Sequence, residues 1–140
     1  MSRIFWDTNL YIYLIEGKSS MAQQVVSLRK KMRARGDQLM TSTLTLGEVL
    51  VKPLQMGDLR LSTVYEKELT LSSVLIPFDA KAAGAYARLR SDRALRAPDA
   101  IQLACAATAG VDLFITNDIR LHSKQVPGIQ FIVPLDRVPI

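Results

Sequence analysis

The sequence predicts an α/β fold, a three-layer α/β/α arrangement around a central, mostly parallel sheet of about four to five short strands. The prediction rests on two observations. Short, almost wholly apolar segments alternate with longer segments whose apolar residues recur at helical spacing. Apolar runs of this kind are typical of parallel strands, because helices cover both faces of a parallel sheet. The length of 140 residues suits one domain, so we expect a single domain over residues 1–140.

The first half of the chain is expected to begin with a strand and to continue mostly as helices. In chain order we expect a strand over 3–6, a helix over 8–16 that stops at Gly17, a helix from about Met21 to Gly36, a strand over 38–41, a helix that Ser42 or Thr43 caps and that ends near Pro53, and a helix over 58–71. Glycine marks helix ends because it adopts the left-handed C-cap conformation without steric cost.

The second half of the chain alternates strands with helices. We expect a strand over 74–76, a helix capped by Asp79, a helix entered through Arg96-Ala97-Pro98 and ending at Gly110, a strand over 113–115 and a last strand over 130–133. Proline suits the first position of a helix, and an acidic residue suits the first turn because the helix N-terminus carries partial positive charge. The Pro98-Asp99 pair therefore predicts a helix start.

The cysteine and histidine content limits the chemistry available to the chain. With one cysteine, Cys105, it forms no internal disulfide, which suits a reducing compartment. One cysteine and one histidine, His122, do not make a Cys/His zinc site, so any metal site must use oxygen ligands, as Mg²⁺, Mn²⁺ and Ca²⁺ prefer. Cys105 is expected in the core and His122 at the surface. No apolar segment is long enough to span a bilayer, and we expect a soluble, cytoplasmic protein.

Charge favours a polyanionic partner. The formal net charge is +5, and nucleic acid is the commonest polyanion that basic proteins bind. One basic cluster, residues 29–35, is interpreted as the solvated face of its helix. Arg93 and Arg96 lie shortly before Asp99 and are the basic residues most expected to hold substrate phosphates. The alternative for this pair is a solvated charged turn.

Acidic residues stand at corresponding places along the predicted sheet. Asp7 and Asp118 each follow a strand, Glu48 lies in the helix after the second strand, and Asp99 opens the helix before the fourth. Parallel α/β sheets bind ligands outside the carboxyl ends of their strands, so we expect these carboxylates to converge at that edge. Two carboxylates about 4 Å apart repel by roughly 4 kcal/mol at an effective dielectric of 20. A divalent cation between them removes this repulsion.

Each acidic residue also has an ordinary structural interpretation. Asp7 suits an N-cap, Asp99 a first-turn acid and Asp118 a turn former. Glu48 suits a solvent-facing helix position. The order of the set favours a shared site over these separate roles.

The motifs around these acids resemble those of the PIN-domain family. The resemblance is carried by Asp7-Thr8-Asn9 after the first strand, Glu48 after Ser42-Thr43, Pro98-Asp99-Ala100-Ile101 and Thr116-Asn117-Asp118. It covers essentially the whole chain, with the acids in the family's order. Within the family, the chain is most similar to the VapC-type ribonuclease toxins of bacterial toxin–antitoxin pairs.

The resemblance implies a metal-dependent endoribonuclease in which Asp7, Glu48, Asp99 and Asp118 are catalytic. Asp7 and Asp99 would bind Mg²⁺ or Mn²⁺ directly, and Glu48 and Asp118 would act through water or a second ion. Asn9 and Thr116 would orient the carboxylates. The implied partners are an RNA substrate, a cognate antitoxin and a second copy of the chain.

Two alternatives keep the fold and change the function. One is a PIN nuclease that processes RNA and is not a toxin, and the other is a PIN module that binds RNA or protein without cleaving. The intact acidic set argues against the second. A phospho-receiver domain is also a small α/β fold, but it would need an acidic pair after its first strand and a lysine near its last. Asp7 is followed by Thr8 and Asn9, which excludes that pattern.

Overall fold

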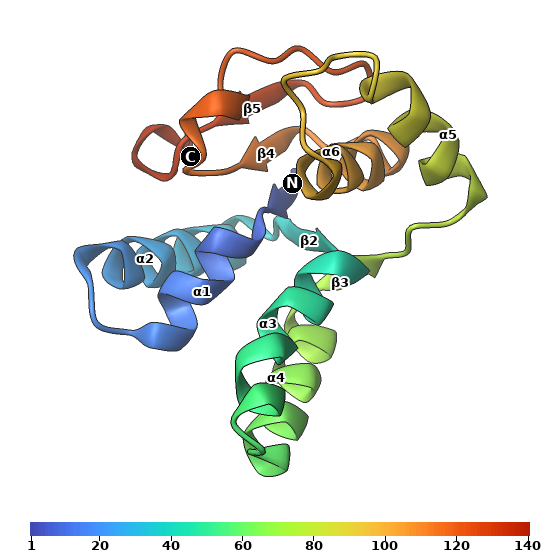
Figure 1. Cartoon of the computed structure of the whole chain (residues 1–140). Helices are drawn as coiled ribbons and strands as arrows, with labels where there is room; N and C mark the ends of the chain where they lie inside the picture. Colours follow the sequence, from blue (N-terminus) through green and yellow to red (C-terminus); the bar gives the residue numbers. More distant parts are fainter.

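The computed structural model describes residues 1–140 and contains a five-stranded sheet with the strand order β3-β2-β1-β4-β5 (Figure 1). The strands are β1 (Arg3–Trp6), β2 (Gln38–Ser42), β3 (Val74–Ile76), β4 (Leu113–Ile115) and β5 (Phe131–Val133). Every neighbouring pair is parallel. The predicted α/β/α class with a central parallel sheet is confirmed.

Helices occupy the positions that the apolar spacing and the glycines predict. They are α1 (Thr8–Glu16), α2 (Ser20–Arg35), α3 (Thr43–Gln55), α4 (Leu59–Ser72), α5 (Ala80–Leu89) and α6 (Ala97–Ala109), with short 3-10 helices η1 (Ile119–Leu121) and η2 (Leu135–Arg137). Gly17, Gly36 and Gly110 are left-handed C-caps.

α3 ends at Gln55, so the predicted end near Pro53 is confirmed, with Pro53 buried inside the last turn. One predicted detail of the helices is wrong. α6 begins at Ala97, so Pro98 takes the second helical position and not the first.

Hydrophobic cores lie on both faces of the sheet, because successive strand residues point to opposite sides. Ile4 and Trp6 belong to the core beneath α1 and α2, whereas Phe5 belongs to the core beneath α5 and α6. Phe5 stacks on Phe114 of β4, with ring centroids 4.9 Å apart. Cys105 is fully buried in this second core, as expected. A register slip of one residue would exchange the two faces, so the cores fix the strand register.

Asp7 directly follows the central strand β1, at the point where the strand order reverses. The chain adds β2 and β3 on one side of β1 and then β4 and β5 on the other. Trp6 pairs with Ile115, so the residues that follow, Asp7 and Thr116, leave the sheet side by side. The Asp7 N–H donates to the Ile115 carbonyl at 3.0 Å. Open α/β sheets bind ligands at such a switch point.

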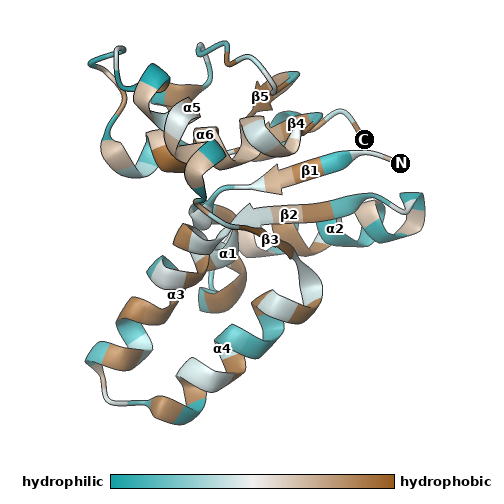
Figure 2. Cartoon of the chain, turned by 90° about the vertical axis from the view of Figure 1, so that its right-hand side faces the viewer, coloured by the Kyte–Doolittle hydropathy of each residue, from teal (hydrophilic) through white to brown (hydrophobic).

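The α3–α4 hairpin extends away from the sheet (Figure 1), and hydrophobic residues occur along both of its helices (Figure 2). Around the turn between the two helices, Leu54 is 51%, Met56 67% and Leu59 69% exposed. The hairpin contacts the rest of the domain through Val49 and Leu69, which join the core beneath α1 and α2. None of the helices is long and apolar enough to cross a membrane.

Candidate functional site

Asp7 is a buried carboxylate at the carboxyl end of the central strand. It is 9% exposed and is the N-cap of α1, where its Oδ1 accepts a hydrogen bond from the Thr8 N–H at 2.8 Å. Oδ2 accepts from the Thr116 hydroxyl at 2.7 Å, and Oδ1 accepts from the Gln102 amide at 3.2 Å. Burial raises the pKa of Asp7, and these hydrogen bonds partly oppose the rise. The capping role is confirmed, and it leaves Oδ2 of Asp7 bonded only to Thr116.

A buried glutamine connects three helices around Asp7. Gln102 of α6 is 2% exposed, and its side-chain NH₂ lies 2.7 Å from the Thr45 hydroxyl and 3.1 Å from the Thr8 hydroxyl. Its carbonyl oxygen accepts from the Ser42 hydroxyl. Ser42 occupies the N-cap position of α3, as predicted. Its hydroxyl makes no capping hydrogen bond to the helix and instead donates to Gln102.

Thr116 is the other residue that directs Asp7. Besides donating to Asp7, its hydroxyl accepts from the Asn9 amide at 3.3 Å and from the Asp118 N–H at 3.1 Å. Asn9 reaches Asp7 through Thr116 and does not bond to any carboxylate itself. The side-chain oxygen of Asn9, Oδ1, is buried and has no hydrogen-bond partner.

Glu48 lies on α3 and connects to Asp7 through Thr8. Its Oε1 accepts from the Thr8 hydroxyl at 2.7 Å, and the residue is exposed. After burial, the negative charge of Glu48 is a further cause of the raised pKa of Asp7. The two carboxylates therefore interact electrostatically across Thr8.

Asp99 and Asp118 form the second acidic pair and share a cation. Asp99 lies in the first turn of α6, and Asp118 is the N-cap of η1. Arg120 reaches both, with its Nη2 3.6 Å from Asp99 Oδ2 and its Nε 2.9 Å from Asp118 Oδ1. Burial and then the charge of Asp118 raise the pKa of Asp99, with a smaller upward contribution from Asp7. The hydrogen bond from Arg120 holds the pKa of Asp118 below its usual range.

The comparison with known families decides the assignment of the chain. A family model of the PIN domain matches residues 4–126. The chain belongs to the PIN-domain family. A search of curated proteins gave no match.

Solved structures with a similar fold come from toxin–antitoxin complexes. A chain of VapBC2 from Rickettsia felis, bound to a DNA fragment from its promoter, superposes with a TM-score of 0.75 at 16% identity, over 94% of this chain and 98% of that one. A chain of DNA-bound VapBC from Salmonella typhimurium gives 0.73 at 19% identity, over 96% and 99%. VapBC-5 from Mycobacterium tuberculosis gives 0.61 at 21% identity, over 94% and 98%. These similarities show that the PIN fold extends over the whole chain.

Sequence reasoning about this PIN domain missed Arg120 and Gln102, and it was wrong about His122. His122 is half-buried, and its Nε2 lies 2.7 Å from the Thr116 carbonyl, because η1 turns the chain back beneath the end of β4. The proximity of Arg120 to Asp118, two residues away, was a usable local signal. Gln102 was signalled by its position as a polar residue within the apolar stretch of α6.

Of the two arginines predicted to hold phosphates, only Arg96 affects the acids electrostatically. Arg96 is the N-cap residue of α6. Its charge opposes the raised pKa of Asp99 and adds to the lowering of the pKa of Asp118. Arg93 is exposed in the loop before α6 and forms no ion pair. In the 29–35 cluster, Arg35 pairs with Asp37 at 2.8 Å.

The donor set of this PIN domain suits a divalent ion held by two carboxylates. Asp7 and Asp99 both have pKa values raised by burial, so a nearby cation would favour the ionised form of each. Mg²⁺ takes only one or two protein carboxylates directly and keeps several waters. No group of three or more His, Cys, Asp or Glu side chains is placed to hold an ion together. Glu48 and Asp118 are engaged with Thr8 and Arg120 instead.

We predict that Gln102→Leu destabilises the metal-free protein. Burial raises the folded-state pKa of Asp7, so the free energy of unfolding decreases as pH rises through that pKa and the buried carboxyl group ionises. Gln102 donates a hydrogen bond to the ionised carboxylate, so its removal makes this decrease larger. The substitution also leaves the Ser42 hydroxyl without its acceptor. In urea unfolding with EDTA at pH 7, we expect a loss of about 1–3 kcal/mol.

The matched control for this prediction is Gln130→Leu, because Gln130 is exposed. Its free energy of unfolding should change by less than about 0.5 kcal/mol. Equal losses for the two variants, or a Gln102→Leu loss that does not shrink as pH falls toward about 4, would contradict the assigned role of Gln102.

Proposed function

We propose that this PIN domain is a metal-dependent endoribonuclease and the toxin of a type II toxin–antitoxin pair. The observation that carries the proposal is Asp7, a buried carboxylate of raised pKa at the switch point of a parallel sheet. A buried carboxylate without a paired cation is costly, and folded proteins keep such groups where function requires them. Family membership supports hydrolysis of nucleic acid as that function.

In this proposal Asp7 and Asp99 hold Mg²⁺ or Mn²⁺. When bound, the ion makes water easier to deprotonate and stabilises the extra negative charge on the phosphorus centre during in-line attack. Thr116 and Gln102 fix the orientation of Asp7 by donating hydrogen bonds to its two oxygens. Glu48, held by Thr8, adds negative charge on the α3 side of the site.

The substrate of the proposed enzyme is RNA held through its phosphates. Arg93 and Arg96 lie immediately before α6, whose first turn carries Asp99. Their guanidinium groups are exposed, so they are available to phosphate oxygens at the entrance to the site. The net charge of +5 adds a long-range attraction for a polyanion.

We test the nuclease proposal with Asp7→Asn and Asp99→Asn. Each substitution removes one of the two carboxylates assigned to the ion, so cleavage of total RNA in Mg²⁺ or Mn²⁺ should fall by at least about 100-fold. EDTA should abolish wild-type cleavage. The readout is the set of new 5′ ends mapped after incubation with purified protein.

The control for the nuclease test is Asp136→Asn, which changes an exposed acid that forms no ion pair. It should cleave like the wild type. Cleavage that persists in EDTA, or an Asp7→Asn variant as active as Asp136→Asn, would refute the proposed site.

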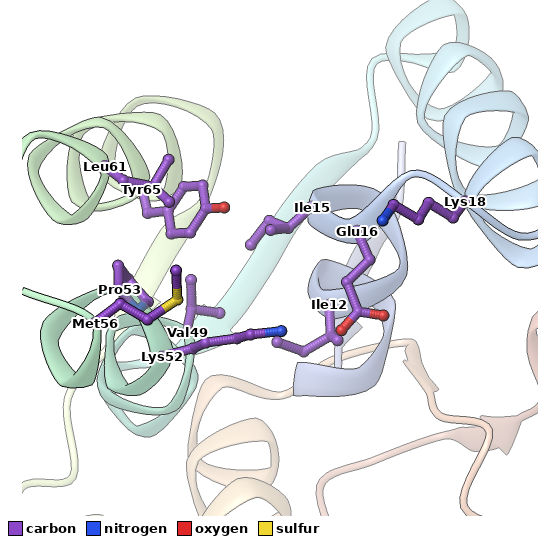
Figure 3. A pocket seen from close by; sticks show the side chains of 10 residues that line it. All are labelled: Ile12, Ile15, Glu16, Lys18, Val49, Lys52, Pro53, Met56, Leu61 and Tyr65. Atoms are coloured by element: carbon purple, nitrogen blue, oxygen red, sulfur yellow. The ribbon is translucent and has the colours of Figure 1, made fainter. Parts of the chain in front are cut away.

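A groove between α1, α3 and α4 is the surface we assign to the antitoxin (Figure 3). Its volume is about 410 Å³. Figure 3 shows that its lining comes from α1, from the segment just after it and from both arms of the hairpin; the residues are Ile12, Ile15, Glu16, Lys18, Val49, Lys52, Pro53, Met56, Leu61 and Tyr65. Apolar residues form most of this lining, and its charged residues are Lys18, Lys52 and Glu16, so positive charge exceeds negative charge by one.

The composition of this groove suits an amphipathic helix with acidic residues beside its apolar face. A second groove shares Ile15 and Tyr65 with the first and continues over α1 to Arg29 and Arg33 of α2. The two together give an elongated apolar path with basic residues along it. Helix-in-groove binding uses such a path for the apolar face of a partner helix. The similar structures from VapBC complexes support an antitoxin as the partner.

We predict that Met56→Asp weakens binding of the cognate antitoxin. Met56 lines the groove and is 67% exposed, so an acidic residue there should disrupt the apolar contact without affecting folding. We expect the dissociation constant from calorimetry to rise about tenfold.

Leu71→Asp is the control for the groove, because Leu71 on α4 is 73% exposed but does not line either groove. It should bind the antitoxin with wild-type affinity. Equal weakening by both variants, or by neither, would remove the groove from the proposal.

A further inference from the structure

Arg120 is the cation that contacts the Asp99–Asp118 pair. Its Nε donates to Asp118 Oδ1 at 2.9 Å and its Nη2 to the other oxygen, which is the two-pronged geometry that guanidinium forms with carboxylates. The same Nη2 lies 3.6 Å from Asp99 Oδ2. The backbone N–H of Arg120 adds a further bond to Asp118 Oδ1 at 3.1 Å. One guanidinium thus connects acids from α6 and η1.

The Arg120 guanidinium contacts Asp99, which is one of the two carboxylates assigned to the divalent ion. Asp118 raises the pKa of Asp99 through its charge, so the two carboxylates repel each other, and Arg120 opposes that effect. With both oxygens of Asp118 occupied by Arg120, fewer lone pairs remain for another ligand. A guanidinium at Asp99 and a divalent ion held by Asp7 and Asp99 would share the Asp99 carboxylate and repel each other.

The surroundings of Arg120 allow its side chain to move away from Asp99. It is 48% exposed, and it belongs to a three-residue 3-10 helix whose neighbouring Ile119 is 79% exposed. Its ion pairs are with Asp99 and Asp118 and no other residue. The contact with Asp99 is a single one at 3.6 Å, unlike the two-pronged pair with Asp118, so a divalent ion can displace the guanidinium from Asp99.

We propose that Arg120 is a built-in counter-ion that occupies the space between Asp99 and Asp118 in the metal-free protein and thereby sets the affinity for the divalent ion. This inference rests on the proposed metal-dependent function. Ion binding at Asp7 and Asp99 moves the guanidinium away from Asp99, while Asp118 retains it through the remaining hydrogen bonds. Arg120 is a positioning residue in this scheme, because it acts on the ion through the carboxylates.

The test is the affinity of purified, metal-free protein for Mn²⁺, measured from the signal of free Mn²⁺ in electron paramagnetic resonance. Removing the competing guanidinium in Arg120→Gln should tighten Mn²⁺ binding about fivefold relative to the wild type. The matched control is Arg96→Gln, because Arg96 influences Asp99 and Asp118 electrostatically but forms no ion pair with either. That variant should tighten binding by less than about twofold. Circular dichroism confirms folding of each variant.

Each outcome of this experiment decides the proposal. A fivefold gain confined to Arg120→Gln supports it. Unchanged Mn²⁺ affinity in Arg120→Gln overturns it. Equal gains in the two arginine variants also overturn it, because they would reflect a general loss of positive charge. In both cases, Mn²⁺ binding by the wild type leaves the proposed function standing. Absence of Mn²⁺ binding by all three proteins overturns the metal site and this inference together.

Discussion

The structure depends on keeping the Asp7 carboxylate buried at the end of the central strand of a parallel sheet. Ionised carboxylates are poorly stabilised away from water, and burial raises the pKa of Asp7 accordingly. Two requirements follow for its surroundings. Hydrogen-bond donors must satisfy both oxygens, which Thr8, Thr116 and Gln102 do. Positive charge must also be available when the group is ionised, because hydrogen bonds offset the cost of burial only in part.

The hydrogen-bond donors around Asp7 meet the first of these requirements, and the charged side chains around it bear on the second. The donors come from α1, from the end of β4 and from α6, so the same contacts that satisfy the carboxylate also hold these elements together. Its neighbours add negative charge through Glu48 and Asp99, which makes the site more acidic than the basic protein around it. Arg120 offsets part of this charge at Asp118. The site therefore combines a fixed carboxylate with neighbours whose partners can change.

The sequence was sufficient for the fold and the family, because both have local signals, whereas the roles of the four acids stay a prediction. Apolar strands, glycine C-caps and the motif around Pro98-Asp99 each occupy a few adjacent residues. The contact of Gln102 with Asp7 joins residues 95 positions apart, and no local pattern specifies such a contact. The half-buried position of His122 likewise depends on how η1 folds back on β4. What sequence could not provide was the pairing of polar side chains in space.

The most direct test of the account is the pKa of Asp7, followed by carbon NMR of its carboxyl group during a pH titration. In EDTA the account predicts a pKa above the ordinary value of about 3.9, because burial disfavours the ionised form. With saturating Mg²⁺ the pKa should fall below that value, because a bound cation favours the carboxylate. An ordinary or lowered pKa in EDTA, or a raised pKa that Mg²⁺ leaves unchanged, would contradict the claim that this buried acid is kept for a metal ion.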